Sequence, residues 1–139
     1  MISSLFKISR PINVIISVVS VLISAFILKQ DYSSKLVLTT CLIVAGFTIF
    51  SNVINDIFDF KTDKFNRPNK PLPNHKISIR TAVIFSIMVL LLCIYATQQL
   101  NLLSQNIVYF IVIPVIITYT PVFKSIPLLG NIIIGAMLG

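Results

Sequence analysis

Long stretches of this chain carry no charged residue, and this restricts its possible folds more than any other feature. The charge-free segments are residues 11–28, 36–55 and 81–123. The last segment is interrupted by two polar stretches, 98–101 and 104–106, which predict a turn between two helices. Four segments of about 17 to 22 residues result, each close to the ~20 that an α-helix needs to cross the hydrocarbon core of a membrane.

Composition supports a membrane protein. The 139 residues are 56% hydrophobic and 11% charged. A buried core helix could explain one apolar segment, but four in so short a chain would leave almost no polar surface. A fifth segment begins at Ile126 and reaches the last residue, Gly139. The sequence therefore predicts an all-α, polytopic transmembrane helical bundle of about four and a half spans, in which Cys41 and Cys93 pack within spans.

The basic residues are distributed unevenly between the two sides of the predicted spans. One side receives Lys7, Arg10, Lys61, Lys64, Arg67, Lys70, Lys76, Arg80 and Lys124, whereas the other receives only Lys29 and Lys35. The positive-inside rule then predicts a multi-pass protein, most simply of the cell membrane, with the N-terminus and the Asp-rich loop at 56–80 in the cytoplasm. Anionic lipid headgroups account for the net charge of +7. Nucleic acid is not an expected partner, because the basic residues form no aromatic-interleaved soluble surface.

Acidic residues are rare, yet three of the four lie within residues 52–63. In one continuous helix the polar stripe Asn52, Asp56, Asp59 and Asp63 would fall within about 60°, with Asn55 at its edge. Carboxylates grouped on one face repel one another unless a cation binds them. An all-oxygen donor set without an EF-hand pattern favours Mg²⁺, which takes its remaining ligands from a substrate phosphate. The stripe thus predicts a magnesium–phosphate clamp.

The loop at 67–73, RPNKPLP, follows the carboxylates and supplies positive charge. Its three prolines stiffen the backbone and prevent the helix from continuing. We therefore expect Arg67 and Lys70 to be held near the carboxylates, where Arg can bind a phosphate bidentately and Lys acts as a point charge. The neighbouring Lys61, Lys64, His75 and Lys76 are expected to be solvated loop residues.

Residues 52–73 combine the pattern NxxNDxxDxxxD with RPxKPLP. This combination resembles the first signature of the UbiA superfamily of intramembrane prenyltransferases. Weaker similarities lie at 10–13 (RPIN), 119–124 (YTPVFK) and 127–131 (PLLGN). The resemblance implies a nine-span helical bundle around a cavity open to the cytoplasmic side and to lipid. Such enzymes transfer a polyprenyl group from its diphosphate to a lipid-soluble acceptor and use Mg²⁺.

The resemblance also implies roles for individual residues. Asp56, Asp59 and Asp63 would hold Mg²⁺ with help from Asn52 and Asn55; Arg67, Lys70 and Lys124 would contact the diphosphate; Tyr119 would lie near the reacting end. Family members are roughly twice as long and carry a second Asp-rich motif, whereas no residue after Asp63 is acidic. Residues 1–139 are therefore expected to be the truncated N-terminal portion of one prenyltransferase domain, inactive alone.

Two short stretches of the sequence bear on the acceptor. The stretches at 7–13 and 53–59 are most similar to the geranylgeranylglycerol-phosphate geranylgeranyltransferase branch. An aromatic quinone precursor stays open as the acceptor, as do the prenyl chain length and the oligomeric state. Two further alternatives are a transport subunit whose carboxylates bind a permeating cation and a non-catalytic half that assembles with another chain.

Overall fold

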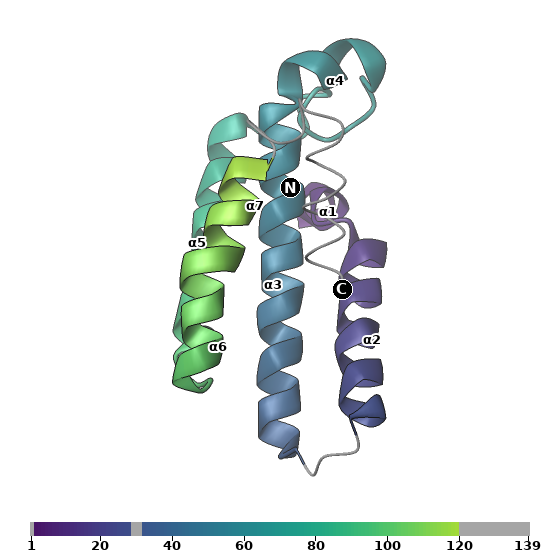
Figure 1. Ribbon diagram of the computed structural model, residues 1–139. Helices are drawn as coiled ribbons and strands as arrows, with labels where there is room; N and C mark the ends of the chain where they lie inside the picture. The colour runs from purple at the N-terminus through teal and green to yellow at the C-terminus, as the bar shows by residue number, and fades with distance from the viewer. Residues whose placement is uncertain (1, 29–31, 120–139) are drawn as a thin grey trace.

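A computed structural model describes residues 2–28 and 32–119, and every regular element in this part of the chain is helical (Figure 1). The elements are α1 (Ile2–Ile8), α2 (Pro11–Ile27), α3 (Ser34–Phe58), α4 (Phe60–Asn66), α5 (Ile79–Thr97), α6 (Leu102–Ile107), the π-helical turn η1 (Val108–Val112) and α7 (Ile113–Tyr119). The all-α prediction is confirmed. The predicted fifth span, from Ile126, lies outside the described residues.

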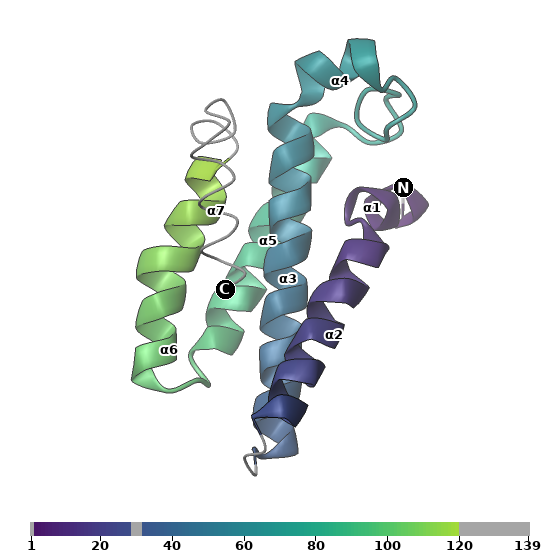
Figure 2. The same ribbon diagram turned by 45° about the vertical axis from the view of Figure 1, so that its right-hand side comes forward.

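The long helix α3 is the centre of the bundle. It packs against α2 on one side and α5 on the other, and α7, at the end of the segment formed by α6, η1 and α7, also contacts it (Figures 1 and 2). Three helical segments of the described chain are long and apolar enough to cross a membrane: Ser34–Phe58, Ile79–Thr97 and Leu102–Tyr119. The pair α1 and α2 makes a fourth if it counts as one span bent by 55°. The described residues thus contain three, or with this bent pair four, of the predicted spans.

The bend between α1 and α2 occurs at Arg10 and Pro11. Proline has no backbone N–H and suits the first position of a helix, where that donor would be unpaired. Its ring also disfavours the right-handed helical conformation in the preceding residue. Arg10 adopts left-handed backbone angles, φ 50° and ψ 73°, in place of the extended angles that a following proline usually favours. This conformation is costly for a residue with a side chain, so surrounding contacts must hold it in place.

Polar side chains at the helix ends explain where three helices begin. Ser33, Ser78 and Asn101 each accept a hydrogen bond from a backbone N–H three residues on. Such N-caps satisfy donors that have no partner within the helix. The predicted turn at 98–101 is confirmed, whereas the polar residues at 104–106 lie inside α6. A polar stretch in this chain can therefore mark the start of a helix as well as a turn between helices.

The last described span is not a regular α-helix, because it contains the turn η1 just before Pro114. A proline within a helix donates no hydrogen bond and its ring collides with the carbonyl group four residues earlier, here that of Phe110. A wider π-helical turn is one way to accommodate this within a continuous span. The sequence pattern of apolar residues alone gave no sign of it.

Two small clusters of buried residues hold the described helices together. One consists of Ile8, Val53, Leu72, Ile77 and Ala82, and it joins α1, α3, α5 and the loop after α4. The other consists of Ile43, Phe47 and Cys93, between α3 and α5. Many large apolar side chains on the outer faces are exposed. That distribution suits helices whose outer faces meet lipid or further helices.

Gly46 allows α3 and α5 to approach closely. A Cβ atom added at Gly46 would lie 2.2 Å from the Sγ of Cys93. Small residues at helix interfaces have this function in membrane proteins, where dispersion contacts replace the hydrophobic effect between helices. Cys41 and Cys93 are both buried, and neither forms a disulfide. The prediction that they serve as packing residues is confirmed.

We predict that Gly46→Ala lowers the stability of the protein by about 1–3 kcal/mol, because it overpacks the α3–α5 contact. Cys93→Ala removes the sulfur that the new methyl group would meet, so the double variant should recover part of the loss. Thermal unfolding of the four proteins in detergent measures this cycle. The packing account would be contradicted if Gly46→Ala lowered the stability equally in the unaltered protein and in the Cys93→Ala variant.

Candidate functional site

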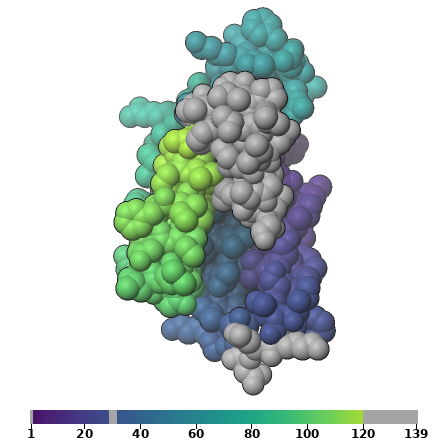
Figure 3. Space-filling model, viewed as in Figure 1, coloured from purple at the N-terminus to yellow at the C-terminus, as the bar shows by residue number. Residues whose placement is uncertain are grey.

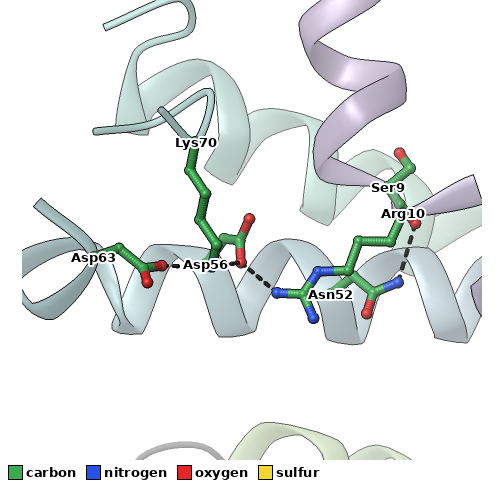
Figure 4. Close-up of polar contacts among 6 residues, drawn as sticks. All are labelled: Ser9, Arg10, Asn52, Asp56, Asp63 and Lys70. Atoms are coloured by element: carbon green, nitrogen blue, oxygen red, sulfur yellow. Dashed lines mark hydrogen bonds and ion pairs between the residues drawn. The ribbon is translucent and has the colours of Figure 1, made fainter. Parts of the chain in front are cut away.

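Two buried carboxylates meet two cations at the end of the bundle where α2 begins and α3 ends, here called the carboxylate end (Figure 4). Lys70 Nζ lies 3.0 Å from Asp56 Oδ1 and 2.6 Å from Asp63 Oδ2. Arg10 Nη2 lies 2.6 Å from the same oxygen of Asp56. These four residues, the charge cluster, come from the α1–α2 bend, α3, α4 and the loop after α4.

Burial makes these ion pairs mutually dependent. The carboxylate side chains of Asp56 and Asp63 are 5% and 10% exposed, whereas those of Lys70 and Arg10 are 19% and 35% exposed. An ionised carboxylate removed from water needs a close cation and hydrogen bonds to remain charged. Two anions and two cations together make the cluster neutral. Its positive members are the more exposed ones, so they are the members that solvent can reach.

The loop after α4 places Lys70 on the carboxylates. Pro71, Leu72 and Pro73 are buried, and Leu72, only 1% exposed, packs in the cluster that contains Val53. The backbone N–H of Lys70 also donates to the carbonyl of Arg67 at 3.1 Å. The prediction of a loop held near the carboxylates is confirmed. In the space-filling view this loop and α4 form the top of the molecule (Figure 3).

The other basic residues of this loop and its surroundings are more exposed than Lys70. Arg67 is exposed, and within the described residues it forms no ion pair with a carboxylate. Lys61, Lys64, His75 and Lys76 are also exposed, as predicted. A role of Arg67 in binding diphosphate stays a prediction.

The polar stripe is not on one continuous helix, so that part of the prediction is wrong. α3 ends at Phe58 and α4 begins at Phe60, with Asp59 between them at φ −76° and ψ −1°. This ψ departs from helical values near −42° and redirects the following residues. No group of three His, Cys, Asp or Glu side chains close enough to hold a metal occurs among residues 2–28 and 32–119. The ligand roles predicted for Asp56, Asp59 and Asp63 stay predictions.

The remaining predicted residues lie in different surroundings. Asn52 is buried in α3, where its Nδ2 donates to the carbonyl oxygen of Ser9 at 3.0 Å (Figure 4). Asn55 is half-buried one turn farther along α3. Tyr119 is half-buried and is the last residue of α7, whose direction brings it to the carboxylate end. Lys124 lies outside the described residues.

Arg10 is the residue of the charge cluster that sequence reasoning missed as a site residue. It appeared as a positive charge ahead of the first span and as part of the weaker similarity at 10–13, but without a role in the site. The available signal was Pro11, because a proline restricts the backbone of the residue before it and often ends a helix there. The strained backbone of Arg10 and its pairing with Asp56 mark this bend as part of the site.

Comparison with protein families matches residues 17–139 to the UbiA prenyltransferase family. The chain belongs to this family. The resemblance inferred from residues 52–73 is thereby confirmed. The helices described above and the family together identify an integral membrane protein.

Known relatives of this UbiA family member include several digeranylgeranylglyceryl phosphate synthases. The one from Methanothrix thermoacetophila is 32% identical over 98% of this chain and 51% of its own length. Those from Methanosphaera stadtmanae and Methanothermobacter thermautotrophicus are 29% and 34% identical over 96% of this chain, and 48% and 46% of their own lengths. The chain thus spans about half the length of these relatives. No solved structure matches it.

We predict that Asn52→Ala lowers the stability by about 1–3 kcal/mol, because the buried Ser9 carbonyl loses its hydrogen-bond donor. Asn74 is an exposed loop residue of the same type, so Asn74→Ala should change stability by less than about 0.5 kcal/mol. Unfolding of both variants in detergent makes the comparison. Equal effects would mean that the contact does not hold the α1–α2 bend on α3.

Proposed function

We propose that the full-length protein transfers a polyprenyl group from a prenyl diphosphate to a lipid-soluble acceptor within the membrane, with Mg²⁺. The observation that carries this proposal is the charge cluster, because it gathers buried carboxylates and cations at one end of an otherwise apolar bundle. The names of the relatives support geranylgeranyl transfer to geranylgeranylglycerol phosphate as the specific reaction.

The donor set of the site suits a hard divalent cation. Asp56 and Asp63 offer oxygen atoms only, and these two carboxylates already share one positive group, Lys70 Nζ. Mg²⁺ prefers such oxygen ligands and completes its coordination with water and substrate phosphates. Asp56, Asp63 and, one turn from each, Asp59 would hold the ion. When bound, it would offset the negative charge that grows on the departing diphosphate.

The basic residues of the carboxylate end would hold the diphosphate. Arg67 is exposed beside the cluster, and its guanidinium can bind two phosphate oxygens at once. Lys70 and Lys124 would add single point charges. The apolar surfaces of the bundle would accommodate the isoprenoid tail and keep water from the allylic carbon, near which we place Tyr119.

We also propose that the carboxylate end faces the cytoplasm. Within the described residues, this end carries Lys7, Arg10, Lys61, Lys64, Arg67, Lys70, Lys76 and Arg80, whereas the opposite end carries Lys35. The positive-inside rule relates such an asymmetry to a cytoplasmic location. Water-soluble prenyl diphosphate headgroups would then reach the site from inside the cell.

Replacing Asp56, Asp59 or Asp63 with Asn should each reduce prenyl transfer by at least about a hundredfold, ~3 kcal/mol of transition-state stabilisation, because Asn keeps the shape but removes a charge from the metal site. Lys61→Gln is the matched control, since Lys61 is exposed in α4. Turnover of radiolabelled geranylgeranyl diphosphate by the full-length protein measures both. Equal activity of Asp59→Asn and Lys61→Gln would refute the clamp and favour a transport function.

The orientation predicts a labelling pattern in intact cells. In a background lacking Cys41 and Cys93, Asn74→Cys at the carboxylate end should be protected from an impermeant thiol reagent. Gln99→Cys, in the turn between α5 and α6 at the other end, should react readily. The reverse pattern would place the site outside the cell and overturn the proposed route of the substrate.

A further inference from the structure

Lys70 is the one residue of the described chain that bonds to both buried carboxylates (Figure 4). We propose that its ammonium group is a built-in counter-ion, which occupies the divalent-cation position while no substrate is bound and transfers to the diphosphate afterwards. The inference rests on the proposed function, since it assigns the order of events at that same site. Lys70 would then pair first with the carboxylates of Asp56 and Asp63 and afterwards with the diphosphate.

The geometry makes the two cations mutually exclusive. Lys70 Nζ lies 3.0 Å from Asp56 Oδ1 and 2.6 Å from Asp63 Oδ2, so it occupies the space between the carboxylates. A divalent cation shared by the same oxygens would sit about 2.0–2.1 Å from each of them. An ammonium and a divalent cation this close would repel strongly in a buried site. Lys70 must therefore leave when the metal site fills.

The surrounding structure permits the side chain to move while the loop stays in place. Leu72 fixes the loop in the buried cluster with Val53, two residues after Lys70. The Lys70 side chain retains 19% exposure, and a lysine has four rotatable methylene groups before its ammonium. Arg10 approaches Asp56 from a different element, the α1–α2 bend. Movement of the Lys70 side chain therefore does not require movement of the α1–α2 bend.

A binding order follows from the charges. When no phosphate is present, Lys70 can leave the two buried carboxylates only by moving into water. The loss of these two ion pairs opposes the binding of a divalent cation alone. With a prenyl diphosphate present, the ammonium gains phosphate oxygens as new partners. The divalent cation should thus bind weakly alone and tightly together with the diphosphate.

The first test uses Mn²⁺ as the probe and the electron paramagnetic resonance signal of free Mn²⁺ as the readout, on the full-length protein in detergent. Lys70→Gln should bind Mn²⁺ alone at least about tenfold more tightly than the unaltered protein. Lys70→Arg keeps the positive charge at the site, and Lys61→Gln removes an exposed charge in α4. Neither variant should therefore bind Mn²⁺ more tightly than the unaltered protein. Mn²⁺ affinity of Lys70→Gln equal to that of the unaltered protein would overturn the proposal.

A second measurement uses the unaltered protein, so its outcome does not depend on whether a variant folds. Lysine acylation followed by mass spectrometry should modify Lys70 several-fold faster at saturating Mn²⁺ than without metal, and addition of a non-hydrolysable prenyl diphosphate should protect it again. The exposed Lys61 should react equally throughout. An unchanged Lys70 rate would contradict the exchange.

These tests separate the inference from the proposed function. If Mn²⁺ and the diphosphate analogue bind together, and Asp56→Asn abolishes this, the proposed function stands whatever Lys70 does. If Asp56→Asn and Asp63→Asn leave that joint binding unchanged, the metal site itself is refuted, and the counter-ion role of Lys70 fails with it.

Discussion

The burial of Asp56 is the constraint on which the rest of this structure depends. A carboxylate that is 5% exposed in a mostly apolar bundle has to be paired, and here Arg10 and Lys70 bond to the same oxygen atom. These cations lie 46 and 14 residues away along the chain. Each cation is carried by a segment that is not regular helix: Arg10 by the bend at Pro11, and Lys70 by the proline-rich loop after α4. The helix interruptions thus serve the site.

Packing at the carboxylate end supports the same arrangement. Ile8 from α1, Val53 from α3 and Leu72 from the loop are each at most 1% exposed and belong to one buried cluster. The hydrogen bond from Asn52 to Ser9 fixes the α1–α2 bend beside that cluster. Apolar packing therefore positions the two segments that carry the cations, while the ion pairs satisfy charges that the packing has removed from water. Neither set of interactions would be favourable without the other.

The sequence was sufficient for the spans because a charge within the hydrocarbon core is so unfavourable that spans must avoid it. The grouping of the few acidic residues likewise predicted where the charge cluster would lie, since carboxylates in such a chain are rare. The interruption at Asp59 and the turn η1 could not be predicted from periodicity. They follow from local backbone geometry and tertiary packing, which override the helical repeat. Arg10 was missed because its partner is distant in sequence, and only the folded chain brings the two together.

The central claim is that Asp56 and Asp63 form a divalent-cation site that Lys70 fills until substrate binds. The most direct measurement is a structure of the full-length protein with Mn²⁺ and a non-hydrolysable geranylgeranyl diphosphate, in which anomalous scattering locates the metal. We predict a manganese peak between the two carboxylates, with Lys70 Nζ on the diphosphate oxygens. A metal bound elsewhere, with Lys70 still bridging Asp56 and Asp63, would contradict this account.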